Sequence, residues 1–134
     1  MTRRGHRLAL VLVFVGGAVG GTVRVLIDNS FGEQVAWELV TVNVVGSVLL
    51  GLFAGFLSKR PRPVLYAAVG PGLLGGFTTF SGLAAFEWQG HAVVPNVGVL
   101  VFTTLAAVGG AAAGWLAGVR IGHGMLGARE EELA

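Results

Sequence analysis

Residues able to bind an ion gather in one stretch of the chain, which reads Gly72-Leu-Leu-Gly-Gly-Phe-Thr-Thr-Phe-Ser81. Three glycines there precede hydroxyl and phenylalanine side chains, within an otherwise apolar segment. If that segment crosses a membrane, such a cluster at mid-depth favours a break in the helix, where exposed carbonyl groups and half-helix ends bind ions in transporters. We predict an ion site at this break; a glycine-rich kink used only for packing is the alternative.

The same region contains a literal match to a dinucleotide-binding motif, Gly70-Pro-Gly72-Leu-Leu-Gly75. That motif has meaning only between a strand and a helix of a βαβ unit, with an acidic residue about 20 positions further on. The match here lies in the middle of an apolar segment. We therefore exclude a nucleotide cofactor.

Asn43 is a second candidate, because it stands alone among valine, glycine and leucine residues, with Ser47 one helical turn later. A carboxamide offers two N–H donors to an anion, without the fixed positive charge that would trap it. Its alternative role is a hydrogen bond between helices. Thr103 and Thr104 supply further hydroxyl groups, which more often bond back to their own helix.

Ionisable groups are nearly absent from the apolar stretches. Arg24 is the only cation among them, and at the end of its stretch it is expected to extend its guanidinium towards the outer surface. No Asp, Glu, Lys or His stands at mid-depth, which excludes a proton relay, an acid–base pair and a three-ligand metal site. Catalysis is therefore not expected. A proton-coupled exporter of the small four-helix type is also disfavoured, because the nearest acid of the first stretch, Asp28, lies at its end.

The elements that must position these residues are four long apolar runs. Of the 134 residues, 54% are apolar and 12% charged, far from the balance of a soluble domain. A helix needs roughly 20 residues to cross about 30 Å of hydrocarbon. We place the four spans at 8–27, 37–57, 64–88 and 93–119. The chain is thus predicted to be a single all-α membrane domain of four transmembrane helices, the third broken at mid-membrane.

The placement of charge predicts the orientation of these spans. All lysines and arginines except Arg24 fall on one side of the four-span arrangement, and the opposite loops carry none. Because Lys and Arg are retained on the cytoplasmic side, both termini are expected in the cytoplasm of a multi-pass protein of the cell membrane. Basic residues split among short flanking segments do not form a nucleic-acid surface. Tyr66 and Trp115 are expected near the inner interface, and Trp37 and Trp88 near the outer one.

Glycines recur at the spacing that lets membrane helices approach closely. Pairs such as Gly16/Gly20 and Gly51/Gly55, and the triplet Gly110/Gly114/Gly118, lie on three different spans. A monomer is expected to leave some of these faces towards lipid. We therefore predict oligomerisation.

Three segments together resemble the Fluc (CrcB) family of fluoride channels. They are Gly16-Gly-Ala-Val-Gly-Gly-Thr-Val-Arg24, Val42-Asn-Val-Val-Gly-Ser-Val-Leu-Leu-Gly51 and Gly72-Leu-Leu-Gly-Gly-Phe-Thr-Thr-Phe-Ser81. The resemblance implies an antiparallel dimer with two narrow fluoride pores at the subunit interface, and a central structural Na⁺. Its function would be passive fluoride export that protects cytoplasmic enzymes.

Residue roles follow from the resemblance position by position. The carbonyl groups that hold Na⁺ would belong to Gly75 and Thr78. The pore would use Asn43 and Phe80, with hydroxyl groups from Thr79, Ser81 and Thr104.

The chain departs from the family pattern at two places. Leu83 stands where the family has its second pore phenylalanine, and the acidic residue that ends that helix is offset by one, as Glu87. The strong Lys/Arg bias should hold the chain in one orientation, so its antiparallel partner is expected to be a homologous second subunit. Three interpretations remain open: a fluoride channel subunit, a non-conducting structural partner in such a channel, and a transporter of another small anion.

Overall fold

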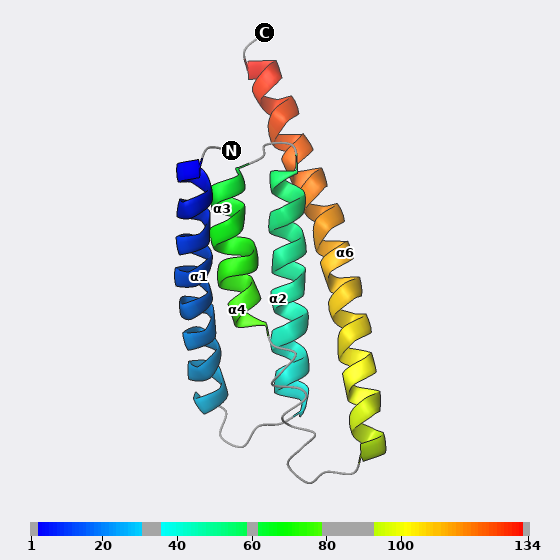
Figure 1. The fold of residues 1–134 in the computed structure, drawn as a ribbon. Coiled ribbons are helices and arrows are strands. Elements are labelled where there is room, and N and C mark those ends of the chain that lie inside the picture. The colour runs from blue at the N-terminus through cyan, green and yellow to red at the C-terminus, as the bar shows by residue number, and fades with distance from the viewer. Residues whose placement is uncertain (1–2, 31–35, 59–61, 79–92, 133–134) are drawn as a thin grey trace.

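In the part of the chain that the structure describes, four helical segments run alternately up and down (Figure 1). The structure is a computed structural model, which describes residues 3–30, 36–58, 62–78 and 93–132. Every regular element in those ranges is helical, which confirms the predicted all-α membrane fold. The elements are α1 (Arg3–Ser30), α2 (Ala36–Leu57), α3 (Pro63–Ala67), η1 (Ala68–Leu74), α4 (Gly75–Phe77) and α6 (Val93–Glu132).

Among the described residues, three helices are long and apolar enough to cross a membrane, within Arg3–Ser30, Glu38–Leu57 and Val97–Gly124. The helix of the third segment, Pro63–Phe77, which comprises α3, η1 and α4, is shorter. With 40 residues α6 is about 60 Å long at 1.5 Å per residue, and its C-terminal part extends past the other helices (Figure 1). Helices α1 and α6 thus run past the predicted spans 8–27 and 93–119, because helix formation does not stop where hydrophobicity does.

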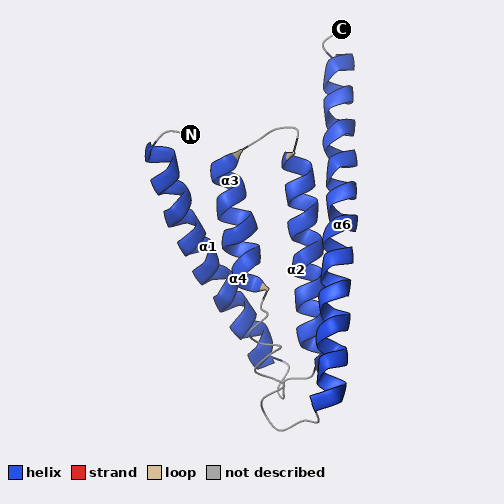
Figure 2. Ribbon diagram, turned by 45° about the vertical axis from the view of Figure 1, so that its right-hand side comes forward, coloured by secondary structure: helices blue, strands red, loops and turns tan. Residues whose placement is uncertain are grey.

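The helices associate as two pairs, α2 with α6 and α1 with the third segment (Figure 2). Glycines allow the two helices of the first pair, α2 and α6, to come into close contact. A Cβ atom added at Gly51 would overlap the carbonyl of Ala111, and one added at Gly114 would overlap the carbonyl of Val48. Backbone contact of this kind lets dispersion forces hold helices together in lipid, where the hydrophobic effect gives no help.

Glycines also allow close contact within the second pair, between α1 and the third segment. A Cβ atom added at Gly20 would overlap the carbonyl of Leu73 and lie 2.8 Å from the backbone nitrogen of Phe77. One added at Gly76 would lie 2.8 Å from the Cα atom of Gly17. The first span and the third segment therefore touch backbone to backbone.

These contacts correct the argument for oligomerisation from glycine spacing. The glycine pairs and the triplet named from the sequence all pack against backbone or side chains of the same chain. Spacing alone could not show this, because a small-residue stripe does not say which helix it meets. At Gly98 and Gly109 of α6, an added Cβ would have no atom of the described residues within 4 Å.

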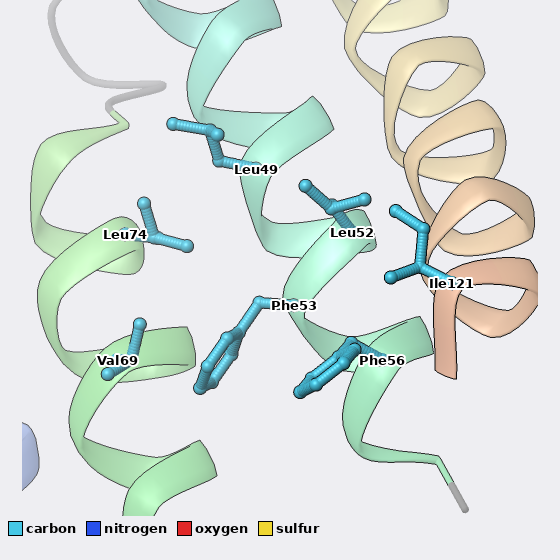
Figure 3. Close-up of a pocket in the computed structure, with 7 residues that line it drawn as sticks. All are labelled: Leu49, Leu52, Phe53, Phe56, Val69, Leu74 and Ile121. Carbon is cyan, nitrogen blue, oxygen red and sulfur yellow. The ribbon is translucent and has the colours of Figure 1, made fainter. Parts of the chain in front are cut away.

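The two pairs meet along a loosely packed seam. A cavity of about 370 Å³ lies there, with a wholly apolar lining (Figure 3). The lining residues are Leu49, Leu52, Phe53, Phe56, Val69, Leu74 and Ile121. Among the described glycines, backbone-to-backbone contact occurs within the pairs, whereas across the seam Gly46 meets side chains of Phe77 and Thr78.

The third segment is irregular before it ends. Pro71 lies inside the π-helical turn η1, and the Gly75 N–H bonds to the carbonyl of Gly70, five residues back. Proline has no N–H, and in an α-helix its ring collides with the carbonyl four residues earlier, a conflict that the wider π turn removes. The helix ends at Phe77, and Thr78 is extended with φ −82° and ψ 147°. The remainder of the predicted span, 79–88, lies outside the described residues.

Candidate ion site

The end of α4 is the first part of the candidate site. The backbone N–H and the Oγ1 hydroxyl of Thr78 both donate to the carbonyl of Leu74, at 3.0 and 3.1 Å. Because Thr78 turns away in an extended conformation, α4 provides no further turn whose N–H groups could pair with its last carbonyls. Gly75, in the same last turn, is exposed. This helix end can therefore offer carbonyl oxygens to a cation.

One face of α2 packs against this helix end. A Cβ atom added at the buried Gly46 would touch the methyl group of Thr78 and lie 3.2 Å from the ring of Phe77. One added at Gly70 would lie 3.5 Å from a methyl group of Leu50. Asn43 lies on the same side of α2, one turn before Gly46 and two before Leu50. The structure thus places Asn43, Thr78 and Gly75 in one region.

Asn43 is held by its own helix. Its side chain is 6% exposed, and Nδ2 donates to the carbonyl of Leu39 at 2.9 Å. A buried carboxamide must be hydrogen-bonded to offset the cost of leaving water. This bond fixes the orientation of the amide in an apolar helix, as an anion-binding group requires.

Arg24 is buried, which corrects the expectation that it extends to the surface. It is 5% exposed, and its Nε atom pairs with Oδ1 of Asp28 at 2.7 Å. Because α1 continues to Ser30, Asp28 lies one turn after Arg24 on the same helix. Opposite charges four residues apart are a signal that the sequence contained. Sequence reasoning missed it by placing Asp28 in a loop.

Two further polar groups at this end of the bundle are buried. The Nη1 atom of Arg24 and both carboxylate oxygens of Glu38 have no hydrogen-bond partner among the described residues. Glu38 lies in the first turn of α2, and this position did not indicate from the sequence that its carboxylate is buried. Buried polar groups are therefore concentrated where α1 ends and α2 begins.

The hydroxyl groups of α6 bond back to their own helix, as the sequence predicted. Thr103 Oγ1 donates to the carbonyl of Val99 at 2.7 Å, and Thr104 Oγ1 to that of Leu100 at 2.8 Å. Thr103 is buried, with 2% of its surface exposed, whereas Thr104 is exposed on another face. Thr104 therefore does not face the interior of the bundle, as Thr103 does. A pore role for it requires a second subunit on that face.

Other predicted site residues lie outside the described residues. They are Thr79, Phe80 and Ser81, and with them the positions at which the chain departs from the family pattern, Leu83 and Glu87. Among the residues that the structure does describe, no group of three or more His, Cys, Asp or Glu could hold a metal ion.

Comparison with known proteins gives consistent matches. Residues 11–119 match the sequence model of a protein family, which is described as CrcB-like protein, Camphor Resistance (CrcB). The chain is 34% identical over 124 residues to a fluoride-specific ion channel FluC 2 of Leifsonia xyli, covering 87% of this chain and 85% of that protein. It is 33% identical over 124 residues to a FluC 2 of Bacillus licheniformis, covering 91% and 92%. With a FluC 1 of Rhodococcus jostii the identity is 37% over 111 residues, covering 83% and 86%.

Proposed function

The chain belongs to the CrcB family, and from that premise we propose that it is a subunit of a fluoride channel through which fluoride leaves the cytoplasm passively. The observation that supports the proposal is that the buried amide of Asn43 lies one helical turn from Gly46, which packs against the helix end at Thr78. The relatives named as fluoride-specific ion channels supply the identity of the ion.

The chemistry of this region suits a small, strongly hydrated anion. A pore must replace the water around fluoride with hydrogen-bond donors, and the edges of phenylalanine rings carry the positive end of the aromatic quadrupole. Asn43 supplies amide donors, while Phe80, Thr79 and Ser81 would supply a ring edge and hydroxyl groups. A lysine would bind the ion too tightly to release it. Amide, hydroxyl and ring edge together make a weak path with several sites.

We further propose that Gly75 and Thr78 hold a structural Na⁺ through their carbonyl groups. The exposed Gly75 and the helix end at Phe77 fit such an ion, because hard cations prefer oxygen ligands and the C-terminal end of a helix carries partial negative charge. When bound, Na⁺ would offset repulsion between the helix ends. Replacing Na⁺ by a large organic cation should lower the stability of the assembly, and an unchanged melting temperature would refute the site.

The proposed assembly is an antiparallel dimer in the cell membrane, with both termini of this chain in the cytoplasm. Among the described residues, no atom lies within 4 Å of a Cβ added at Gly98 or Gly109 of α6, so a second subunit could approach this helix closely at these two positions. Eight of the nine Lys and Arg residues lie at one side of the four spans, which favours a single orientation. The antiparallel partner would then be a homologous second chain.

The test is ion efflux from liposomes that contain this chain alone or together with a homologous subunit. We expect rapid fluoride efflux and no chloride efflux from the pair, and little efflux from this chain alone. Robust fluoride efflux from the single chain would refute the heterodimer but support the channel. Equal efflux of chloride would indicate a transporter of other anions. A mixed assembly that loses all fluoride efflux when the corresponding asparagine of the homologous subunit is replaced would identify this chain as a non-conducting partner.

A further inference from the structure

A pocket of about 360 Å³ lies at the basic end of the bundle, where α2 ends and α3 begins. We call it the basic-end pocket. It is separate from the candidate ion site, which lies at the other end of the third segment. Its lining residues are Ala54, Leu57, Ser58, Arg62, Pro63, Tyr66 and Trp115.

The lining combines one cation, two amphipathic aromatic residues and an apolar wall. Arg62 is exposed and forms no ion pair within the part of the chain that the structure describes. Tyr66 and Trp115 are 41% and 44% exposed. Tyrosine and tryptophan are enriched at the depth of lipid head groups, because one end of each ring is apolar and the other can hydrogen-bond.

Backbone contacts fix the positions of these groups. An added Cβ at Gly55 would lie 3.0 Å from the Cα atom of Trp115, so α2 and α6 meet at this level. The Tyr66 N–H donates to the carbonyl of Arg62 at 2.8 Å, which holds both residues in the first turn of the third segment. Ser58 Oγ donates to the carbonyl of Gly55 at 2.7 Å. With its proton committed there, Ser58 can accept a hydrogen bond, and Arg62 is the cationic donor of the lining for an anion.

We propose that the basic-end pocket binds an anionic phospholipid. The phosphate pairs with the Arg62 guanidinium, the glycerol region lies beside Tyr66 and Trp115, and the start of an acyl chain follows Leu57 and Ala54. Charge complementarity selects this occupant. Arg62 follows Lys59 and Arg60 in the sequence, and basic pockets between membrane helices bind anionic head groups. The apolar cavity of Figure 3 has no polar lining residue, so it offers nothing to a head group.

The test compares two single-charge variants of the full-length chain, Arg62→Gln and Arg7→Gln. Arg7 is also exposed at the basic end but is not part of the pocket lining, so the two variants lose the same charge. Each protein is reconstituted into vesicles of phosphatidylglycerol and phosphatidylcholine in equal amounts and extracted in mild detergent. Retained lipid is then counted by native mass spectrometry.

The original chain and Arg7→Gln should retain phosphatidylglycerol in preference to phosphatidylcholine, and Arg62→Gln should lose that preference severalfold. Arg62→Lys should restore part of it, because a point charge still attracts phosphate but cannot form the bidentate contact. Equal retention by the two glutamine variants would overturn the proposal. So would equal retention of the neutral and the anionic lipid by the original chain, which would indicate nonspecific boundary lipid.

Discussion

The two helix pairs use the same packing device but differ in regularity. In the α2–α6 pair, glycines bring two uninterrupted helices into backbone contact along much of their length. In the other pair, glycines of α1 hold a segment that contains a proline, a π turn and a helix end. Close packing and irregular backbone therefore have different roles in the two pairs. One pair supplies a rigid support, and the other presents carbonyl groups that an unbroken helix would have used internally.

The largest effect is expected from breaking the regular pair. Gly114→Leu drives a side chain into the backbone of α2 at Val48 and Leu52, so it should destabilise the chain by roughly 1–3 kcal/mol or more. Unfolding in a detergent titration and monodispersity on gel filtration measure the loss. Gly124→Leu is the matched control, since an added Cβ at Gly124 meets no atom within 4 Å. Equal behaviour of the two variants would refute the close approach of α2 and α6.

A smaller effect on folding but a clear effect on conduction is expected in the irregular pair. Gly20→Ala places a methyl group against Leu73 and Phe77, which displaces the end of α4. We expect fluoride efflux to fall about tenfold, which corresponds to a rise of roughly 1.4 kcal/mol in the free-energy barrier to conduction. Gly21→Ala is the control, because its added methyl group lies an ordinary 3.9 Å from the carbonyl of Gly76. Matching efflux rates for the two alanine variants would mean that the contact at Gly20 has no part in conduction.

The smallest effect is expected from making the irregular segment regular. Pro71→Ala restores an N–H and removes the ring, so η1 can become α-helical with little change in stability. The turns that follow would rotate, and fluoride efflux should fall by a small factor. Efflux and thermal unfolding of the same preparation separate the two effects. If efflux is unaltered while the π turn has become α-helical in a structure of the variant, the irregularity has no functional role.

The sequence was sufficient for the all-α membrane fold, because long apolar runs predict membrane-spanning helices. The isolation of Asn43 marked a residue that is buried on α2, and its role in a pore stays a prediction. Helix limits were less accurate, because Arg24 and Asp28 stabilise α1 beyond its apolar core. The π turn at Pro71 was not predicted, because proline in a sequence signals a disturbed helix without specifying its form.

The partners of the glycines could not be predicted, and this changed one conclusion. Spacing shows that another helix can approach closely at Gly51 and Gly114, but it does not show that this helix belongs to the same chain. The packing within the chain removes glycine spacing as an argument for a dimer. The proposed dimer now rests on the family resemblance and on Gly98 and Gly109 of α6, where an added Cβ meets no atom of the described residues within 4 Å.

The most direct test of the account replaces Asn43 and compares the result with a neighbouring substitution on the same helix. Asn43→Leu and Thr41→Leu both remove one polar side chain from α2, but Thr41 is exposed whereas Asn43 is buried on the side facing the third segment. Fluoride efflux is measured from liposomes that contain each variant together with the homologous subunit, with folding checked by gel filtration. To isolate the path that uses this chain, the corresponding asparagine of the partner is replaced in every sample. We expect Asn43→Leu to abolish the remaining fluoride efflux and Thr41→Leu to preserve it. Unchanged efflux from folded Asn43→Leu would contradict the account and assign Asn43 to packing alone.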